Sequence, residues 1–146
     1  MFNDEWMREN QLLDSPRTTV EQLLGRRPSG SPPLVSVAPA AMVRQALNLM
    51  NTWDVSQIPV VDNGEPIGTL LENTLMTRAL AQPALLDRPV REVMDAPLPV
   101  VDAHFPTDRL GAMLTRESPA ALVSKEGKLV GIVSRYDVLQ QLIGAR

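Results

Sequence analysis

The chain has 146 residues, of which 44% are hydrophobic and 21% are charged, and its formal net charge is −3 at pH 7. These proportions are typical of one soluble globular domain, and the negative balance argues against nucleic acid as the main partner, because phosphate binding needs a basic face. Cysteine is absent and no apolar run reaches the length of a membrane span, so we expect a cytoplasmic protein with no disulfide, no thiolate metal site and no membrane partner.

The N-terminal part of the chain predicts two short helices. Residues 1–13 have the apolar spacing of a short amphipathic helix, and a break follows at residues 14–17. Thr18 and Glu21 have the spacing of a capping box that opens a helix over residues 20–24. Residues 25–33 contain two glycines, three prolines and two serines, which predicts a loop.

The rest of the chain predicts two series of elements in the same order. Apolar periodicity and turn residues indicate a strand, a helix, a hairpin of two strands and a second helix, in that order, at residues 34–37, 40–52, 58–61, 67–71 and 72–80. A short helix at residues 90–94 introduces the second series, whose elements fall at residues 98–101, 107–114, 120–123, 129–133 and 135–143, with Thr107 as the cap of its first helix.

The two series are copies of one unit. The segment at residues 68–74 returns at residues 131–137, 63 positions later, and the same offset superposes the hairpin glycines Gly64 and Gly127. One offset that fits strand, turn and helix positions together indicates a duplicated supersecondary unit. Each copy alone, at about sixty residues, is marginally stable, so we expect the copies to share one core. The predicted fold class is therefore α/β (α+β), built of two β-α-β-β-α repeats.

The copies differ where the last strand meets the last helix. The second copy has Ser134 and Asp137, whereas the first copy has Leu71 and Thr74. A carboxylate at a helix start can accept hydrogen bonds from the paired hydroxyls of a ribose, and the first amides of the helix, with Arg135, can face an anion. The same spacing also fits a capping box, with Ser134 as the cap and Asp137 reaching back to its amide. The mirror position has no carboxylate, so we expect a site there to be empty or weak.

Other residues with chemical potential lack partners at a recognised spacing. His104 is the only histidine and falls in a predicted loop, so a surface position is expected, and Trp53 is expected in the core or at an interface. The only lysines, Lys125 and Lys128, fall in a predicted hairpin turn, which leaves no buried lysine for a pyridoxal phosphate Schiff base. We find no nucleophile or acid–base constellation and expect a non-catalytic chain without a bound metal or cofactor.

The repeat and its Gly-x-x-Ser-x-x-Asp element at residues 131–137 resemble a tandem pair of CBS domains. The resemblance places the first CBS motif at residues 18–81 and the second at residues 82–146. It implies a regulatory module in which the aspartate of the element binds the ribose of AMP, ATP or S-adenosylmethionine. It also implies a homodimer that associates through helices.

Two further segments are similar to a cystathionine β-synthase. Residues 2–13 resemble the linker between its catalytic domain and its CBS pair, which implies that residues 1–17 are a linker helix from an upstream catalytic domain that uses pyridoxal phosphate. Residues 54–62 resemble the strand that lines the S-adenosylmethionine site of regulated members, with the adenine between apolar strand residues. The ligand-binding residues implied in this way are Leu34, Val35, Val55, Ser56, Gln57, Ile58, Ile132, Ser134, Arg135, Tyr136 and Asp137.

The resemblance leaves the ligand and the context open. Some members that bind S-adenosylmethionine carry an acidic residue at the position of Ser56, and Arg135 suits a phosphate better than a sulfonium. One alternative to the enzyme-linked module is a free-standing adenine-nucleotide sensor that acts on another protein. A second alternative is a structural oligomerisation module that binds no ligand.

Overall fold

The computed structural model describes residues 18–25, 34–115 and 118–144. The expected helix at residues 1–13, the linker assigned to residues 1–17 and the loop at residues 26–33 lie outside this described part. The helices are α1 (Val20–Gly25), α2 (Val43–Trp53), α3 (Glu72–Ala81), α4 (Thr107–Met113) and α5 (Arg135–Gly144), with 3-10 turns η1 (Pro83–Asp87) and η2 (Val90–Glu92). The strands are β1 (Gln57–Asp62), β2 (Glu65–Leu71), β3 (Val100–Asp102), β4 (Ala120–Lys125) and β5 (Lys128–Ser134).

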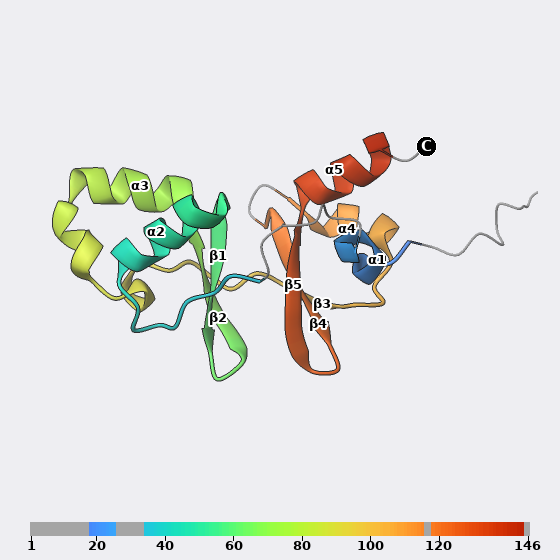
Figure 1. Ribbon diagram of the computed structural model, residues 1–146, viewed down its shortest axis with the longest axis horizontal. Coiled ribbons are helices and arrows are strands. Elements are labelled where there is room, and N and C mark those ends of the chain that lie inside the picture. The colour runs from blue at the N-terminus through green and yellow to red at the C-terminus, as the bar shows by residue number, and fades with distance from the viewer. Residues whose placement is uncertain (1–17, 26–33, 116–117, 145–146) are drawn as a thin grey trace, which may run out of the picture.

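The elements form two α+β units that lie side by side (Figure 1). In the first unit, β1 and β2 form an antiparallel hairpin, with α2 and α3 beside it. In the second unit, β3 runs parallel to β4, and β4 pairs antiparallel with β5. The predicted element order is confirmed in the second unit and, apart from its first strand, in the first unit. None of the helices described is long and apolar enough to cross a bilayer.

The strand expected at residues 34–37 is reduced to a single bridge between Val37 and Val60. The Val37 amide donates to the Pro59 carbonyl at 3.1 Å, and the Val61 amide donates to the Val37 carbonyl at 2.9 Å. Prolines prevent the ladder from extending in either direction, because neither Pro59 nor Pro39 has an N–H to donate. The predicted strand at residues 34–37 was therefore too long. Its partner, β1, is the strand that was predicted at residues 58–61.

The duplication is visible in matching backbone details. Both hairpins carry a register shift at the same place, between Val60 and Val61 and between Val123 and Ser124. Both turns use positive φ at two central residues, 51° and 81° in the first unit and 54° and 80° in the second. Such turns match the twist of the strands they join. The repeat inferred from the sequence is thus a repeat of conformation.

The short introductory helices are exchanged between the units. The Val20 amide of α1 donates to the Phe105 carbonyl, and the Glu21 amide donates to the Ala103 carbonyl, both at 2.9 Å in the second unit. Conversely, the Val90 amide of η2 donates to the Ala41 carbonyl of the first unit at 2.7 Å. In space, α1 therefore completes the second unit, although the sequence places it before the first.

Two equivalent glycines make room for this exchange. A Cβ at Gly68 would overlap the side chain of Met94, which follows η2, and a Cβ at Gly131 would lie 2.9 Å from Cδ1 of Leu24 in α1. A side chain at the glycine of the Gly-x-x-Ser-x-x-Asp element would therefore require the Leu24 side chain to shift. Next to Gly68, Thr69 pairs with Asp95 through two main-chain hydrogen bonds of 2.8 and 3.0 Å.

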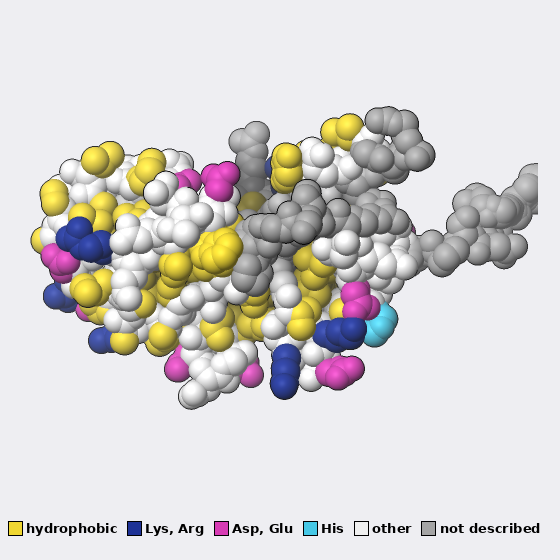
Figure 2. All heavy atoms as spheres, viewed as in Figure 1, with side chains coloured by type: hydrophobic (Ala, Val, Ile, Leu, Met, Phe, Trp, Pro, Cys, Tyr) yellow, Lys and Arg dark blue, Asp and Glu magenta, His cyan; other side chains and the backbone are white. Residues whose placement is uncertain are grey.

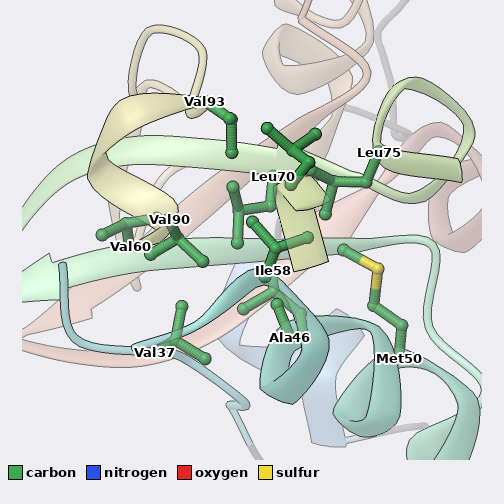
Figure 3. Packing of buried hydrophobic residues seen from close by; sticks show 11 residues of the cluster. Val37, Ala46, Met50, Ile58, Val60, Leu70, Leu75, Val90 and Val93 are labelled. Carbon is green, nitrogen blue, oxygen red and sulfur yellow. The ribbon is translucent and has the colours of Figure 1, made fainter. Parts of the chain in front are cut away.

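The buried side chains divide between the units, so the expected common core is split. The first unit's cluster joins side chains of α2, β1, β2, α3, η1 and η2 (Figure 3). The second unit's cluster includes Val20 and Leu23 of α1 together with side chains of β3, α4, β4 and β5. Leu98, Ala120 and Leu122 form a small third cluster. Leu34 packs against this cluster, so the segment that precedes the first hairpin contacts the second unit.

Two predicted helix caps differ from those observed. The capping box of α1 uses Thr19 and Gln22, whose side chains bond each other's amides at 3.3 and 2.9 Å, so the prediction of Thr18 with Glu21 was wrong by one residue. Thr107 does not cap α4, because the cap position is Pro106. The Thr107 hydroxyl instead donates to the Thr18 carbonyl at 3.0 Å and fastens α4 to the chain entering α1.

Glu21, which was predicted to be part of the capping box, instead forms an ion pair with Lys125 of β4. This pair links α1 to the second unit. The hydrogen bond and the charge of Lys125 lower the pKa of the Glu21 carboxyl below its ordinary value. Because the folded pKa is lower than the unfolded one, the pair stabilises the fold above the unfolded pKa, and this contribution is lost as pH falls through the folded pKa.

We therefore expect Glu21→Gln to remove part of the acid sensitivity. Thermal unfolding between about pH 6 and about pH 3 should show a smaller fall in Tm for the variant than for the wild type. The effect should be small and should weaken with added salt, because the pair is exposed. Identical pH profiles for the two proteins would show that the pair contributes nothing to stability.

Thr69 carries a buried hydroxyl without a hydrogen-bond partner among the described residues. The residue is 2% exposed in the centre of β2. Burying a hydroxyl without a partner is unfavourable, so we expect Thr69→Val to stabilise the protein by about 1 kcal/mol in chemical denaturation. As a control, Thr107→Val removes a hydroxyl that is bonded and should destabilise by about 1 kcal/mol. Destabilisation by Thr69→Val would mean that its hydroxyl has a partner such as a water molecule.

Candidate functional site

The candidate site lies where β5 ends and α5 begins. The Ser134 amide donates to Oδ2 of Asp137 at 2.8 Å, and the Ser134 hydroxyl lies 3.1 Å from the same oxygen. The Asp137 amide donates to Oγ of Ser134 at 3.3 Å. These reciprocal bonds are the capping box that the sequence left open as one of two interpretations.

The capping geometry is compatible with ligand binding. Both side chains are half-buried, so part of each remains accessible from solvent. A carboxylate offers about four acceptor positions, and Ser134 contacts only Oδ2 of Asp137. The same bonds hold the carboxylate in one rotamer at the start of a helix, which is the arrangement that pre-organises it toward a polar ligand.

The neighbours of this pair extend toward solvent. Arg135 is exposed and its side chain forms no ion pair with any part of the chain that the structure describes, while its amide donates to the Pro119 carbonyl at 3.1 Å. Tyr136 is 67% exposed. A cation at the first residue of a helix, together with the helix dipole, provides positive potential for an anionic group.

The structure brings only some of the predicted first-unit residues to this place. Leu34 and Ile132 both pack against the same small cluster in the second unit. Val35 and Val55 instead pack against the first unit's core, and Ile58 is fully buried in it. The side chains of Val35, Val55 and Ile58 therefore pack in the first unit's core, and Ile58 can contact a ligand only through main-chain atoms.

Ser56 and Gln57 occupy the start of the first hairpin. Ser56 is exposed, and its carbonyl accepts a 2.9 Å bond from the Glu72 amide. The equivalent bond in the second unit joins Arg135 to Pro119. Gln57 pairs with Leu71 in the ladder. The two helix starts, α3 and α5, are therefore held to their sheets in the same way, and they differ in their side chains.

The mirror position in the first unit has no comparable side-chain arrangement. Leu71 occupies the cap position of α3 and forms no side-chain cap bond. Thr74, which stands where the second unit has Asp137, is half-buried. The asymmetry predicted from the sequence therefore extends to the capping hydrogen bonds.

Four residues close to the junction of β5 and α5 were not predicted from the sequence. Leu98, Ala120 and Leu122 form the cluster against which Leu34 and Ile132 pack, and the Pro119 carbonyl accepts a hydrogen bond from the Arg135 amide. The repeat offset could have indicated two of them, because it superposes Pro119 and Ala120 on Ser56 and Gln57.

The single histidine pairs with a nearby carboxylate. His104 is exposed as predicted, and its Nδ1 lies 3.0 Å from Oδ2 of Asp102. The His104 amide donates to the same oxygen at 2.9 Å, and this bond is the main cause that lowers the pKa of the Asp102 carboxyl. Across the residues that the structure describes, no three metal-ligating side chains are grouped together.

Comparison with known proteins identifies the repeat. The family model of the CBS domain matches residues 30–80 and residues 90–144, which are the two copies. The chain belongs to the CBS domain family. The CBS domain-containing protein YhcV of Bacillus subtilis is 27% identical over 106 residues, which cover 72% of this CBS pair and 76% of that protein.

Solved structures support the same fold. A putative signal-transduction protein with CBS domains from Burkholderia ambifaria superposes with a TM-score of 0.76 at 26% identity, over 88% of this chain and 96% of that one. The CBS domain of a bacterial CNNM/CorC family Mg²⁺ transporter, solved in complex with ATP, gives 0.71 at 22% identity, over 87% and 88%. The CBS pair of protein MJ0100, solved with 5′-methylthioadenosine and S-adenosyl-L-methionine, gives 0.71 at 19% identity, over 90% and 100%.

Proposed function

We propose that this CBS pair is a regulatory, non-catalytic module that binds an adenosyl ligand at the junction of its two units. The observation that carries the proposal is the half-buried Asp137 carboxylate, held by Ser134 at the start of α5. Its charge is suited to the paired hydroxyls of a ribose. Leu34 and Ile132, which both pack against one apolar cluster, are suited to the adenine.

The comparisons support the ligand class. Two structures with the same fold were solved with ATP and with 5′-methylthioadenosine and S-adenosyl-L-methionine, respectively. These ligands share the adenosyl group and differ in what is attached to its 5′ carbon. The proposal for this chain therefore rests on recognition of the adenosyl group, and the attached group is a separate question.

We propose a phosphorylated ligand, AMP or ATP, in preference to S-adenosylmethionine. Arg135 and the amides at the start of α5 favour negative charge at this position. A sulfonium ligand carries positive charge and would meet Arg135 unfavourably. Whether such binding activates or inhibits a partner depends on which of two arrangements of the CBS pair the ligand binds more tightly.

Isothermal titration calorimetry with AMP, ATP and S-adenosylmethionine tests the proposal. Binding of AMP or ATP at least tenfold tighter than S-adenosylmethionine supports it in full. Preference for S-adenosylmethionine would retain the adenosyl site and reject the role given to Arg135. The absence of heat and of any thermal shift with all three ligands would favour the structural oligomerisation module.

We further propose which protein this module regulates. The resemblance of residues 2–13 to a linker supports a pyridoxal-phosphate-dependent cystathionine β-synthase joined upstream in the cytoplasm. Reading the coding sequence upstream of Met1 tests this link. An in-frame catalytic domain would support it, and a stop codon would favour the free-standing nucleotide sensor.

A homodimer is the proposed assembly. Large apolar side chains are exposed at equivalent positions of α3 and α5, namely Met76 and Leu80 at 47% and 82%, and Leu139 and Ile143 at 48% and 64%. Both helices lie along the same side of the molecule, where hydrophobic side chains reach the surface (Figures 1 and 2). Such a patch is typical of an association surface. Sedimentation of Leu139→Glu, compared with wild type, should show loss of the dimer.

A further inference from the structure

The helix α1 brackets the ligand site through two separate contacts. Leu24 lies against Gly131 of β5, three residues before Ser134, and its Cδ1 would be 2.9 Å from a Cβ at that position. On the other side of the site, Val138 follows Asp137 and packs against the cluster that contains Val20 and Leu23. Helix α1 thus contacts both β5 and α5, the two elements whose junction forms the site.

The same helix is firmly joined to the second unit. Main-chain bonds link Val20 to Phe105 and Glu21 to Ala103, and both Val20 and Leu23 are at most 5% exposed. A helix of this length is not stable without tertiary packing. The order of α1 therefore depends on the second unit, and a change in the packing of β5 or α5 changes the free energy of its docking.

We propose that α1 and the Ser134–Asp137 site form one coupled unit, in which Leu24 positions the site and the state of the site alters the docking of α1 on the second unit. This inference goes beyond the proposed function and rests on it only for the identity of the ligand. By thermodynamic reciprocity, whatever stabilises the docked α1 also strengthens the site, and a ligand at the site strengthens the docking of α1.

Hydrogen exchange measured by NMR on the full chain without ligand provides the first test. The reporters are the amides of Val20, Glu21 and Leu23, each of which donates a main-chain hydrogen bond. Asp137→Ala removes the carboxylate that accepts the bond from the Ser134 amide in the capping box of α5, and should raise their exchange rates about three- to tenfold, as expected for the loss of capping hydrogen bonds. Gln45→Ala removes the same kind of capping bond from α2, where the Met42 amide donates to the Gln45 side chain, and should leave these rates unchanged.

The reverse perturbation uses the repeat as its own control. Leu24→Ala should raise the exchange rate of the Ser134 amide at the start of α5. Met94→Ala makes the equivalent change on Gly68 of the first unit and should leave that amide unchanged. If Asp137→Ala leaves the α1 rates within twofold of wild type, or raises α1 and α2 equally, the coupling is absent. If Leu24→Ala leaves the Ser134 amide unchanged, Leu24 does not position the site.

Adding AMP separates this inference from the proposed function. When calorimetry shows that AMP binds, the α1 amides should become more protected in wild type, and Leu24→Ala should reduce that gain by at least half. Binding of AMP without any change in α1 would overturn the transmission from the site to α1. If AMP, ATP and S-adenosylmethionine all fail to bind, the proposed function fails, and the two ligand-free comparisons still decide whether α1 and the site are coupled.

Discussion

Asp137→Ala should lower the affinity for the adenosyl ligand by about ten- to a hundredfold, because one or two hydrogen bonds to a charged group are lost. The side chain is half-buried, its Oδ2 is held by Ser134, and Asp137 is the acidic residue of the first turn of α5. Isothermal titration calorimetry with AMP measures the change. An affinity within threefold of wild type would remove Asp137 from the binding site.

Two control variants separate binding from capping. Thr74→Ala alters the equivalent position of the first unit and should leave the affinity unchanged. Asp137→Asn keeps an oxygen that can accept the bond from the Ser134 amide, so it should retain most of the helix stability and still lose the charge-assisted bonds. If Asn restores both stability and affinity, the role of Asp137 is that of a helix cap. Equal losses for Asp137→Ala and Thr74→Ala would contradict the single-site interpretation.

Leu23→Ala should destabilise the second unit by about 2–4 kcal/mol, because it deletes buried carbon atoms from a packed cluster. The side chain is 5% exposed and lies among residues of β3, α4, β4 and β5. The loss should appear as a lower denaturation midpoint. Residue-resolved hydrogen exchange should show that amides of β4 and β5 lose protection more than those of β1 and β2.

The matched control for this prediction is Leu80→Ala. Leu80 is 82% exposed on α3, so the same substitution there should change the stability of the monomer by less than about 0.5 kcal/mol. If Leu23→Ala is as mild as Leu80→Ala, α1 does not belong to the core of the second unit. If protection is lost mainly in β1 and β2, the assignment of α1 to the second unit is wrong.

Local patterns were enough to predict most of the elements. The Asn63–Gly64 turn, the alternating strands and the 63-residue offset depend on residues that are close together in sequence or related by duplication. They predicted the hairpins, the helix–strand order and the second unit's unique Ser134 and Asp137. The strand at residues 34–37 was overestimated, because the prolines that block its ladder lie partly on the partner strand.

The pairing of helix caps was predicted less well. Thr18 and Thr19 both have a suitable partner three residues later, Glu21 or Gln22, so spacing alone does not choose between them. The choice is made by contacts across the fold, because Thr18 uses its carbonyl for Thr107 and Glu21 pairs with Lys125. For Ser134 and Asp137 the spacing was unambiguous, and the capping box formed.

The sequence by itself determined that the protein is a duplicated α+β unit with one carboxylate at the start of its last helix, because such features follow from local backbone preferences and spacing. The tertiary structure alone decided that α1 belongs to the second unit, that Leu34 packs against a cluster of the second unit, and that the Ile58 side chain is buried in the first unit's core. The physical reason is that a short apolar segment can be buried on either unit. Its partner is chosen by fit, here by the space above Gly131 that Leu24 fills.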